Sequence, residues 1–341
     1  MSNSVILITG ACGFLGGLLA RTLLSHSAAQ ATDVKLILAD VVQPKNAQGQ
    51  NTLAIQANLT DPAQADALFN TAFGVPDTVY CLHGIMSRGS EDNFDLGIKV
   101  NVDSVRSLLD AARHAGERTG TPIKFIFASS LAVYGGPLPD IVTPDTIATP
   151  QSAYGAAKLI DELFINEYTR RGLVDGRILR LPTIAVRPGP PAAASSAFIS
   201  AIIREPLQGA DTTCPIGDSP ASPALDALAL WLASPETTVR NFILARDVPA
   251  SAFASHTRVV CLPGFTATVR DELNALERIA GPEAVARIRF EDDPVNRRIV
   301  GSWPARFDNA YALSLGFVAD EGGMVPIVQR FKDQLEAASQ A

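Results

Sequence analysis

Short apolar runs alternate with longer amphipathic segments along the first half of the chain. The runs have the continuous apolar character of strands buried in a parallel sheet, and they lie at residues 5–9, 34–39, 54–57, 78–82, 124–128 and 177–181. Apolar positions at helical spacing lie between most of them, most clearly at residues 14–25, 62–73, 94–115 and 152–171. This alternation predicts an α/β fold built on a doubly wound parallel sheet.

The pattern of apolar runs and helical segments is interrupted after residue 181. A proline-rich stretch opens at Arg187, and scattered prolines continue to Pro223, which indicates loops. A chain of 341 residues is long enough for one large α/β domain with a second lobe. We expect a main domain over residues 1–181 and a smaller, irregular lobe mainly over residues 182–341, with a strand near residues 258–262 returning to the main sheet.

Composition and charge narrow the possible partners. A net charge of -7 argues against binding to nucleic acid, which requires clustered Lys and Arg. No apolar run approaches the roughly 18 residues of a membrane span, and an apolar strand begins too near the N-terminus for a signal peptide. The four cysteines are widely spaced, which suits a reducing compartment and predicts no metal site. We expect a cytoplasmic protein with a small-molecule ligand.

A glycine-rich turn, GACGFLG at residues 10–16, joins the first predicted strand to the first helix. Gly10, Gly13 and Gly16 would let the backbone approach a pyrophosphate, which the free N–H groups of a helix N-terminus favour. The second strand ends at Asp40, where an acid accepts from ribose hydroxyls and repels a 2′-phosphate. A tight turn and a surface aspartate are the plain alternatives. The combination predicts a Rossmann domain that prefers NAD to NADP.

Two reactive side chains share one face of the predicted helix at residues 152–171. Tyr154 and Lys158 are four positions apart, so the phenol and the ammonium stack on that face. A free phenol is a poor base at neutral pH, and a nearby ammonium favours the phenolate form. The strand at residues 124–128 delivers Ser130 to the carboxyl edge of the sheet, where open α/β sheets bind ligands. Together these residues predict hydride-transfer chemistry with Tyr154 as the acid/base.

Three segments carry a family resemblance: residues 10–16, residues 129–135 (SSLAVYG) and residues 154–158 (YGAAK). They resemble the extended short-chain dehydrogenase/reductase superfamily, of the NAD-dependent epimerase/dehydratase type, over essentially the whole chain. The resemblance implies that Ser130, Tyr154 and Lys158 are catalytic, that Asn101 completes a tetrad, and that residues 1–181 hold NAD. The candidate cofactor contacts are Gly10, Gly13, Phe14, Leu15, Gly16, Asp40, Asn58, Leu59, Leu82, Tyr154, Lys158 and Pro182.

Two positions depart from the family pattern. Where relatives commonly have an H-L-A-G-like segment after the fourth strand, this chain has Cys81-Leu82-His83-Gly84, which places an imidazole near the expected nicotinamide ribose. His83 is either a pH-sensitive neighbour of the site or, as we favour, a structural histidine with satisfied hydrogen bonds. The adenine-side motif usually begins with Asp and here has Asn58, while Thr60 or Asp61 could equally cap the next helix.

Further segments, at residues 84–90, 180–189 and 262–265, resemble the D-erythronate dehydrogenase branch of that superfamily. The resemblance implies oxidation of the C2 hydroxyl of a four-carbon sugar acid. Such a substrate needs a cation for its carboxylate, and Arg187, just past the sixth strand, is the first candidate, with Arg88 the second. Ser87 could hold a substrate hydroxyl, while Ser130 and Tyr154 would hold the reacting oxygen.

Other functions stay open from the sequence. The same superfamily contains sugar-nucleotide epimerases and dehydratases that retain NAD, and the fold alone cannot separate them from a dehydrogenase. A dinucleotide-sensing regulator without catalysis is a more remote alternative, given Ser130, Tyr154 and Lys158. The helices at residues 94–115 and 152–171 correspond to those that pair as a dimer interface in relatives, so we expect a homodimer.

Overall fold

A seven-stranded parallel sheet forms the centre of the main domain in the computed structural model, which describes residues 4–30, 33–44, 51–189 and 195–339. Its strand order is β10-β6-β5-β4-β1-β2-β3, and every neighbouring pair is parallel. The strands are β1 Ser4–Thr9, β2 Val34–Asp40, β3 Thr52–Gln56, β4 Thr78–Cys81, β5 Lys124–Ser130, β6 Asp175–Leu181 and β10 Val259–Cys261. The order reverses beside β1, as in doubly wound folds, so the predicted fold class is confirmed.

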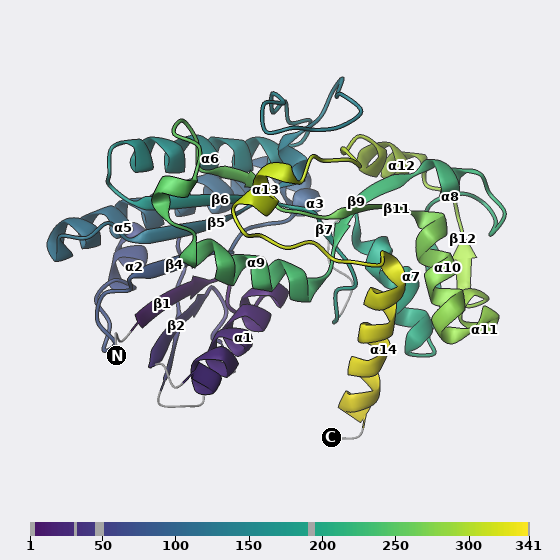
Figure 1. Cartoon of the computed structure of the whole chain (residues 1–341), viewed down its shortest axis with the longest axis horizontal. Coiled ribbons are helices and arrows are strands. Elements are labelled where there is room, and N and C mark those ends of the chain that lie inside the picture. The colour runs from purple at the N-terminus through teal and green to yellow at the C-terminus, as the bar shows by residue number, and fades with distance from the viewer. Residues whose placement is uncertain (1–3, 31–32, 45–50, 190–194, 340–341) are drawn as a thin grey trace.

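Helices cover both faces of this sheet (Figure 1). Alternate side chains of a strand point to opposite faces, and in β1 Leu7 packs with α2, α5 and α6 while Ile6 and Ile8 pack with α1, α9 and α13. All three β1 side chains are fully buried. The helices are α1 Phe14–Gln30, α2 Pro62–Ala67, α5 Ser104–Thr119, α6 Ala153–Arg170, α9 Pro235–Asp247 and α13 Ala310–Ser314.

Two predicted helices differ from the structure. The segment expected as one helix over residues 94–115 is α4 (Phe94–Ile98), a π-helical turn η1 (Lys99–Asp103) and then α5. The backbone N–H of Ser104 bonds the carbonyl of Lys99, five residues earlier, while the Ser104 hydroxyl donates to the carbonyl of Val100. A side-chain hydroxyl thus satisfies the carbonyl that the wider turn leaves free. The helix expected at residues 62–73 ends at Ala67 and gives way to shorter three-residue turns.

The second lobe has its own hydrophobic core, between a three-stranded sheet and a group of helices at the right of Figure 1. The sheets have the orders β11-β9-β7 and β12-β8. Their strands are β7 Thr183–Ile184, β8 Thr212–Cys214, β9 Ala229–Ala233, β11 Phe265–Thr268 and β12 Ile288–Phe290. The helices are α7 Ala197–Leu207, α8 Ala224–Ala227, α10 Val269–Ala280, α11 Pro282–Val285, α12 Pro294–Gly301 and α14 Met324–Ser339.

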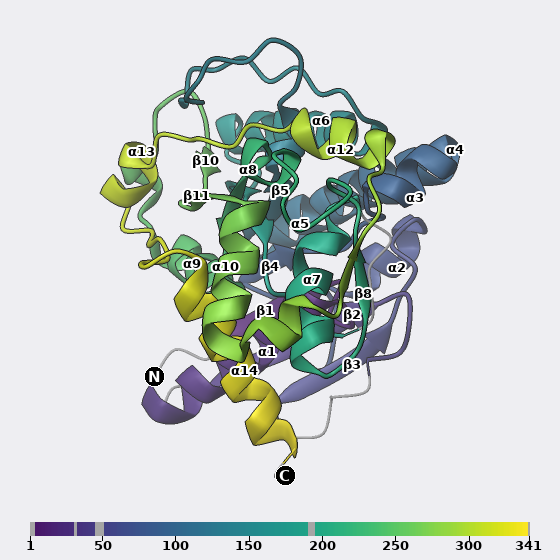
Figure 2. The ribbon, with the colours of Figure 1, turned by 90° about the vertical axis from the view of Figure 1, so that its right-hand side faces the viewer.

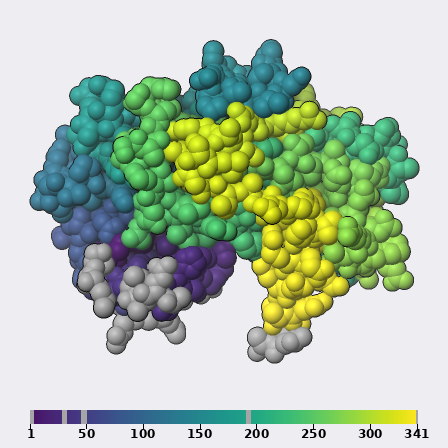
Figure 3. Space-filling view, in the orientation of Figure 1, coloured from purple at the N-terminus to yellow at the C-terminus, as the bar shows by residue number. Residues whose placement is uncertain are grey.

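The chain passes back and forth between the two lobes. Strand β10 lies where a returning strand was expected, and its Val260 pairs with Leu179 of β6. Helices α9 and α13 also pack on the main sheet, although both follow residue 181. Figure 2 shows the lobes from the side, and Figure 3 shows the yellow C-terminal part lying across the front of the molecule. The two lobes therefore meet along several segments, and the space between them can form a site.

Three short elements complete the described chain: α3 (Ser87–Asp92), η2 (Leu131–Val133) and η3 (Ala250–Ala252). Helix α3 follows β4, and η2 follows β5, so both lie beyond the carboxyl edge of the main sheet. None of the helices in the described ranges combines the length and apolar character needed to span a bilayer.

Candidate active site

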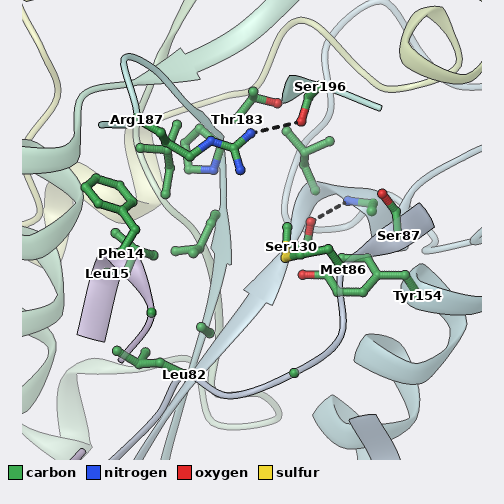
Figure 4. Close-up of a pocket in the computed structure, with 18 of the residues that line it drawn as sticks. Phe14, Leu15, Leu82, Met86, Ser87, Ser130, Tyr154, Thr183, Arg187 and Ser196 are labelled. Atoms are coloured by element: carbon green, nitrogen blue, oxygen red, sulfur yellow. Dashed lines mark hydrogen bonds between the residues drawn. The ribbon is translucent and has the colours of Figure 1, made fainter. Parts of the chain in front are cut away.

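A cavity of about 480 Å³ opens between the carboxyl ends of the main-sheet strands and the second lobe. The glycine turn lines one part of it, and Ser130, Tyr154 and Lys158 line the middle. Residues of the second lobe, including Arg187, line the far part (Figure 4). Phe14, Leu15, Leu82 and Pro182 also line the cavity, as expected of cofactor contacts. The fold thus brings most of the predicted cofactor and catalytic residues into one space, but Asp40, Asn58, Leu59 and Asn101 do not line it.

Two glycines of the turn, Gly10 and Gly16, have no room for a side chain. Gly10 has φ +70, and a Cβ there would lie 2.8 Å from the backbone nitrogen of His83. A Cβ on Gly16 would lie 2.2 Å from the carbonyl oxygen of Gly10. Glycine at these positions lets the first turn of α1 lie close against the end of β1. This leaves a bare backbone at a helix N-terminus, which is the cradle that a pyrophosphate requires.

Asp40 lies beside this turn at the end of β2. Its Oδ2 accepts a hydrogen bond from the Cys12 N–H at 2.9 Å, and its Oδ1 accepts from the Val42 N–H at 3.3 Å. The carboxylate is therefore held at the side of the loop where a dinucleotide would present its adenosine ribose. The glycine cradle, the helix N-terminus and this placed carboxylate together fit NAD.

The expected adenine-side contacts lie elsewhere. Asn58 accepts through Oδ1 from the backbone N–H and the hydroxyl of Thr60, and Leu59 is buried in the core. Neither residue lines the cavity. Asp61 accepts from the Ala63 N–H and caps α2, which is one of the roles that the sequence had left open. Contact of Asn58 and Leu59 with adenine remains a prediction.

Tyr154, Lys158 and Ser130 reach the cavity from α6 and β5. The Lys158 ammonium is 5.6 Å from the centroid of the Tyr154 ring and 4.5 Å from that of Phe127, and Lys158 is only 4% exposed. The Ser130 Oγ accepts from the Ala132 N–H at 3.1 Å, so its own proton is available to another acceptor. Figure 4 shows the Tyr154 ring extending from α6 toward Ser130. A phenol, a buried ammonium and a hydroxyl so placed can move one proton and hold one oxygen.

Packing fixes the approach of α6 to β5. A Cβ on Gly155 would lie 2.0 Å from the Ala132 carbonyl oxygen, so only glycine lets the start of α6 lie this close to η2. Ser152 caps the helix by accepting from the Gly155 N–H. The close contact between α6 and η2 brings Tyr154 and Ser130 to the same cavity.

A buried ion pair ties the same helix to the sheet. Arg180 donates through Nε and a terminal nitrogen to both carboxylate oxygens of Glu162, at 2.9 and 2.6 Å. Glu162 also accepts from Ser129, which precedes Ser130, and Arg180 donates to the Tyr134 hydroxyl. Because Glu162 is eight positions after Tyr154, it lies on the same face of α6. The network anchors α6 to β5 and β6.

Asn101 serves the loop that follows β4. Its Oδ1 accepts from the Ile85 N–H at 2.7 Å, and its Nδ2 donates to the Ile85 carbonyl and to Ser90 Oγ. The side chain is buried and does not line the cavity. Asn101 therefore holds the segment that carries Ser87 into the cavity, while a catalytic role for it remains a prediction.

His83 has a partner on each ring nitrogen. Nδ1 lies 2.7 Å from Thr9 Oγ1, and Nε2 lies 2.8 Å from Ser104 Oγ. Since the Ser104 hydroxyl donates to Val100, we assign the proton of His83 to Nε2. Burial, with help from the Lys158 charge, lowers the pKa of His83 to about 3. These contacts support the structural role over the pH-sensitive one.

The two candidate arginines have different surroundings. Arg187 lines the cavity, one of its terminal nitrogens donates to Ser196 Oγ at 3.2 Å, and no carboxylate of the described residues lies within 4.0 Å of it. The pKa of Arg187 lies below its ordinary value, mainly because of burial. Tyr154 opposes this change, and the Arg204 charge adds to it. Arg88 lies outside the cavity, and its side chain, 70% exposed, pairs with Asp92 at 3.0 Å. The structure thus brings Arg187, and not Arg88, to the reacting groups.

Several cavity residues were not predicted from the sequence. Most come from the second lobe or its border: Met86, Thr183, Ser196, Ser200, Arg204 and Trp303. The four-residue spacing of Ser196, Ser200 and Arg204 is the one signal that could have revealed part of this set, once a helix was assumed there. Within the described ranges no three His, Cys, Asp or Glu side chains are grouped as metal ligands.

Comparison with known proteins agrees with this geometry. Residues 6–256 match the NAD dependent epimerase/dehydratase family. D-erythronate dehydrogenases of Haemophilus influenzae and Cupriavidus necator are 40% and 41% identical to this chain, over 96% and 92% of it and 98% and 94% of their own lengths. The structure of the nucleoside-diphosphate-sugar epimerase from Agrobacterium tumefaciens matches with a TM-score of 0.88 at 35% identity, covering 98% of this chain and 96% of that one. The chain therefore belongs to the NAD dependent epimerase/dehydratase family.

Proposed function

We propose that this protein oxidises the C2 hydroxyl of D-erythronate, a four-carbon sugar acid, to 2-oxo-D-erythronate, with NAD as the oxidant. The observation that carries the proposal is Arg187, a cavity cation that no carboxylate of the described residues neutralises. A half-buried cation without a carboxylate partner is costly unless a ligand supplies the anion. The similarity to two D-erythronate dehydrogenases supports this choice of acid.

Each of these side chains has a separate role in the proposed reaction. Arg187 binds the substrate carboxylate through its planar pair of donors. Ser130 donates a hydrogen bond to the C2 oxygen, and Tyr154 removes the proton from that oxygen while the Lys158 ammonium stabilises the phenolate. NAD, when bound, supplies the acceptor for the C2 hydride. Ser87, the first residue of α3, lines the cavity and holds a second substrate hydroxyl in this proposal.

Cofactor preference follows from Asp40. We expect kcat/KM with NAD to exceed that with NADP by at least about tenfold, or roughly 1.4 kcal/mol, because the carboxylate repels a 2′-phosphate. Asp40→Ser should narrow the gap, since it removes the charge but keeps a small polar side chain. Initial rates with both cofactors measure the effect. Equal efficiencies in the wild type would remove Asp40 from this role.

The carboxylate assignment is tested by Arg187→Met. The change removes a charge-assisted bidentate contact, so we expect kcat/KM for D-erythronate to fall about 10²-fold, equivalent to roughly 3 kcal/mol. Turnover of an uncharged four-carbon polyol should hardly change. Arg88→Met is the matched control, because Arg88 is an exposed arginine outside the cavity. If only the Arg88 variant lost activity on the acid, the substrate would stand and the choice of arginine would fail.

An NAD-retaining sugar-nucleotide epimerase is the second candidate, favoured by the match to an epimerase structure. The two functions differ in what leaves the site. A dehydrogenase releases NADH with each turnover, whereas an epimerase returns the hydride to the same molecule. A panel of four- to six-carbon sugar acids and UDP-sugars, assayed for reduced cofactor and for isomerised sugar, separates them. A protein that ignores every compound while binding NAD would favour a dinucleotide sensor.

We also propose a cytoplasmic homodimer. Free thiols at Cys81, Cys214 and Cys261 suit a reducing compartment. Large apolar side chains on α4 and α6 are exposed, among them Phe94 at 60% and Leu163 at 64%, and an exposed apolar face of this kind suits contact with a second copy. A monomer by sedimentation at micromolar concentration would reject the dimer.

A further inference from the structure

The N-cap residue and two residues of α7 hold Arg187 at three different points. Ser196, Ser200 and Arg204 are spaced by four residues, so they lie along one face of the helix. Ser196 Oγ accepts from the Arg187 guanidinium at 3.2 Å, and Ser200 Oγ accepts from the Arg187 backbone N–H at 3.0 Å. Arg204 donates to the Arg187 carbonyl at 2.8 Å. The tip and both backbone groups of one residue are thus bonded to a single helix.

These three residues form a built part of the cavity wall. All of them line the cavity, yet Ser196, Ser200 and Arg204 are only 7%, 1% and 4% exposed. Arg204 is neutralised on its other side by Glu205, which does not line the cavity. Ser196 is the N-cap residue of α7, Ser200 and Arg204 lie within the helix, and the apolar side chains of the helix pack into the core of the second lobe. The packing of α7 in this core therefore fixes the positions of these three residues.

We infer that the stripe of Ser196, Ser200 and Arg204 is a positioning element that fixes Arg187 as the receptor for the substrate carboxylate. The inference rests on the proposed function. A bidentate pair requires the guanidinium plane to meet the carboxylate plane, and a flexible arginine loses entropy when it adopts that orientation. Because α7 fixes the backbone on both sides of the Arg187 side chain and also its tip, the orientation is set before the substrate arrives.

The stripe also favours an anion over a neutral ligand. Arg187 and Arg204 place two guanidinium groups in one cavity, and no Asp or Glu of the described chain lines that cavity. Glu205 pairs with Arg204 from outside the cavity, so Arg187 is the arginine whose charge has no carboxylate partner among the described residues, and a bound carboxylate neutralises it. The geometry therefore assigns Arg204 to selection of acids, acting through Arg187 and not by taking part in proton transfer.

A double-mutant cycle tests the inference on the whole enzyme. Ser200→Ala and Arg204→Met are made in the wild type and in Arg187→Met, and kcat and KM are measured for D-erythronate and for the uncharged polyol. In the wild type we expect each change to raise KM for the acid about five- to tenfold with little effect on kcat. In the Arg187→Met background the same changes should alter KM less than twofold. Arg204→Lys keeps a charge and a donor, so it should recover part of the loss.

Matched controls and folding checks keep the outcome clear. Ser314→Ala and Arg278→Met make the same chemical changes on exposed helix positions of α13 and α10 and should leave KM unchanged. Thermal unfolding and NAD binding report whether a variant is folded. If Arg204→Met does not fold, the result for Ser200→Ala, the smaller change, decides the test. Equal effects of the stripe changes with and without Arg187 would overturn the inference alone. A wild-type KM for the acid in Arg187→Met would overturn the carboxylate assignment and the inference with it.

Discussion

Tyr154→Phe should lower turnover of D-erythronate by a factor of about 10² to 10⁴ while leaving NAD binding nearly unchanged. The change removes one oxygen, and that oxygen is the proposed acid/base. Lys158 and Ser130 remain in place in the variant, so the cofactor and the substrate can still bind. Steady-state rates with saturating NAD and D-erythronate, together with a fluorescence titration of the cofactor, measure the two quantities separately.

Two further variants make this result specific. Tyr168→Phe deletes the same atom from the same helix, where the Tyr168 hydroxyl donates to Asp110 at a distance from the cavity, and it should keep near-normal turnover. Lys158→Met should damage both turnover and NAD binding, because the ammonium is expected to hold the nicotinamide ribose as well as to stabilise the phenolate. Near-normal turnover in Tyr154→Phe would exclude Tyr154 as the acid/base.

The main sheet could be predicted because most of its strands are buried on both faces. Such strands read as continuous apolar runs, and all six runs in the first half correspond to strands β1 to β6. The break in the helix at residues 94–115 could not be predicted in this way. It depends on the hydroxyl of Ser104, which bonds both Val100 and His83, and His83 comes from a different part of the chain.

The candidate catalytic and cofactor residues could be proposed from the sequence, because their spacing reflects local geometry. The glycine turn needs Gly10 and Gly16 to bring a strand and a helix together, and Tyr154 and Lys158 need one helical turn between them. The far wall of the cavity has no such local rule. Arg204 and Trp303 reach it from separate segments of the second lobe, so only the tertiary fold reveals them.

The burial of charged side chains was the other feature that could not be predicted from the sequence. In the pattern of α6, Asp161 and Glu162 are typical of a solvated helix face, yet they are 0% and 1% exposed. Glu162 has Arg180 as its partner, whereas neither carboxylate oxygen of Asp161 has a hydrogen-bond partner among the described residues. The pairing of a buried charge depends on a distant strand, and hydrophobic periodicity carries no information about it.

Asp161 leads to a prediction about stability and pH. Burial raises the pKa of its carboxyl from 3.8 to about 8, although the nearby Lys158 charge lowers it and Glu162 raises it further. Between these two values the folded protein holds a proton that the unfolded chain has released. Asp161 therefore destabilises the fold increasingly as the pH rises from about 4 to 8, and this destabilisation stays constant above that range.

Asp161→Asn should consequently stabilise the protein more at high pH than at low pH. Asparagine has nearly the same shape and stays neutral, so it resembles the protonated acid and the two proteins should unfold alike near pH 4, where the destabilisation begins. Near pH 9 the variant should be more stable by about 2–5 kcal/mol, measured as the free energy of unfolding in denaturant. Asp66→Asn, on an exposed position of α2, is the control and should shift stability equally at both pH values. The same constant shift for Asp161→Asn would show that folding does not raise the pKa of this carboxyl, and that burial does not hold its proton.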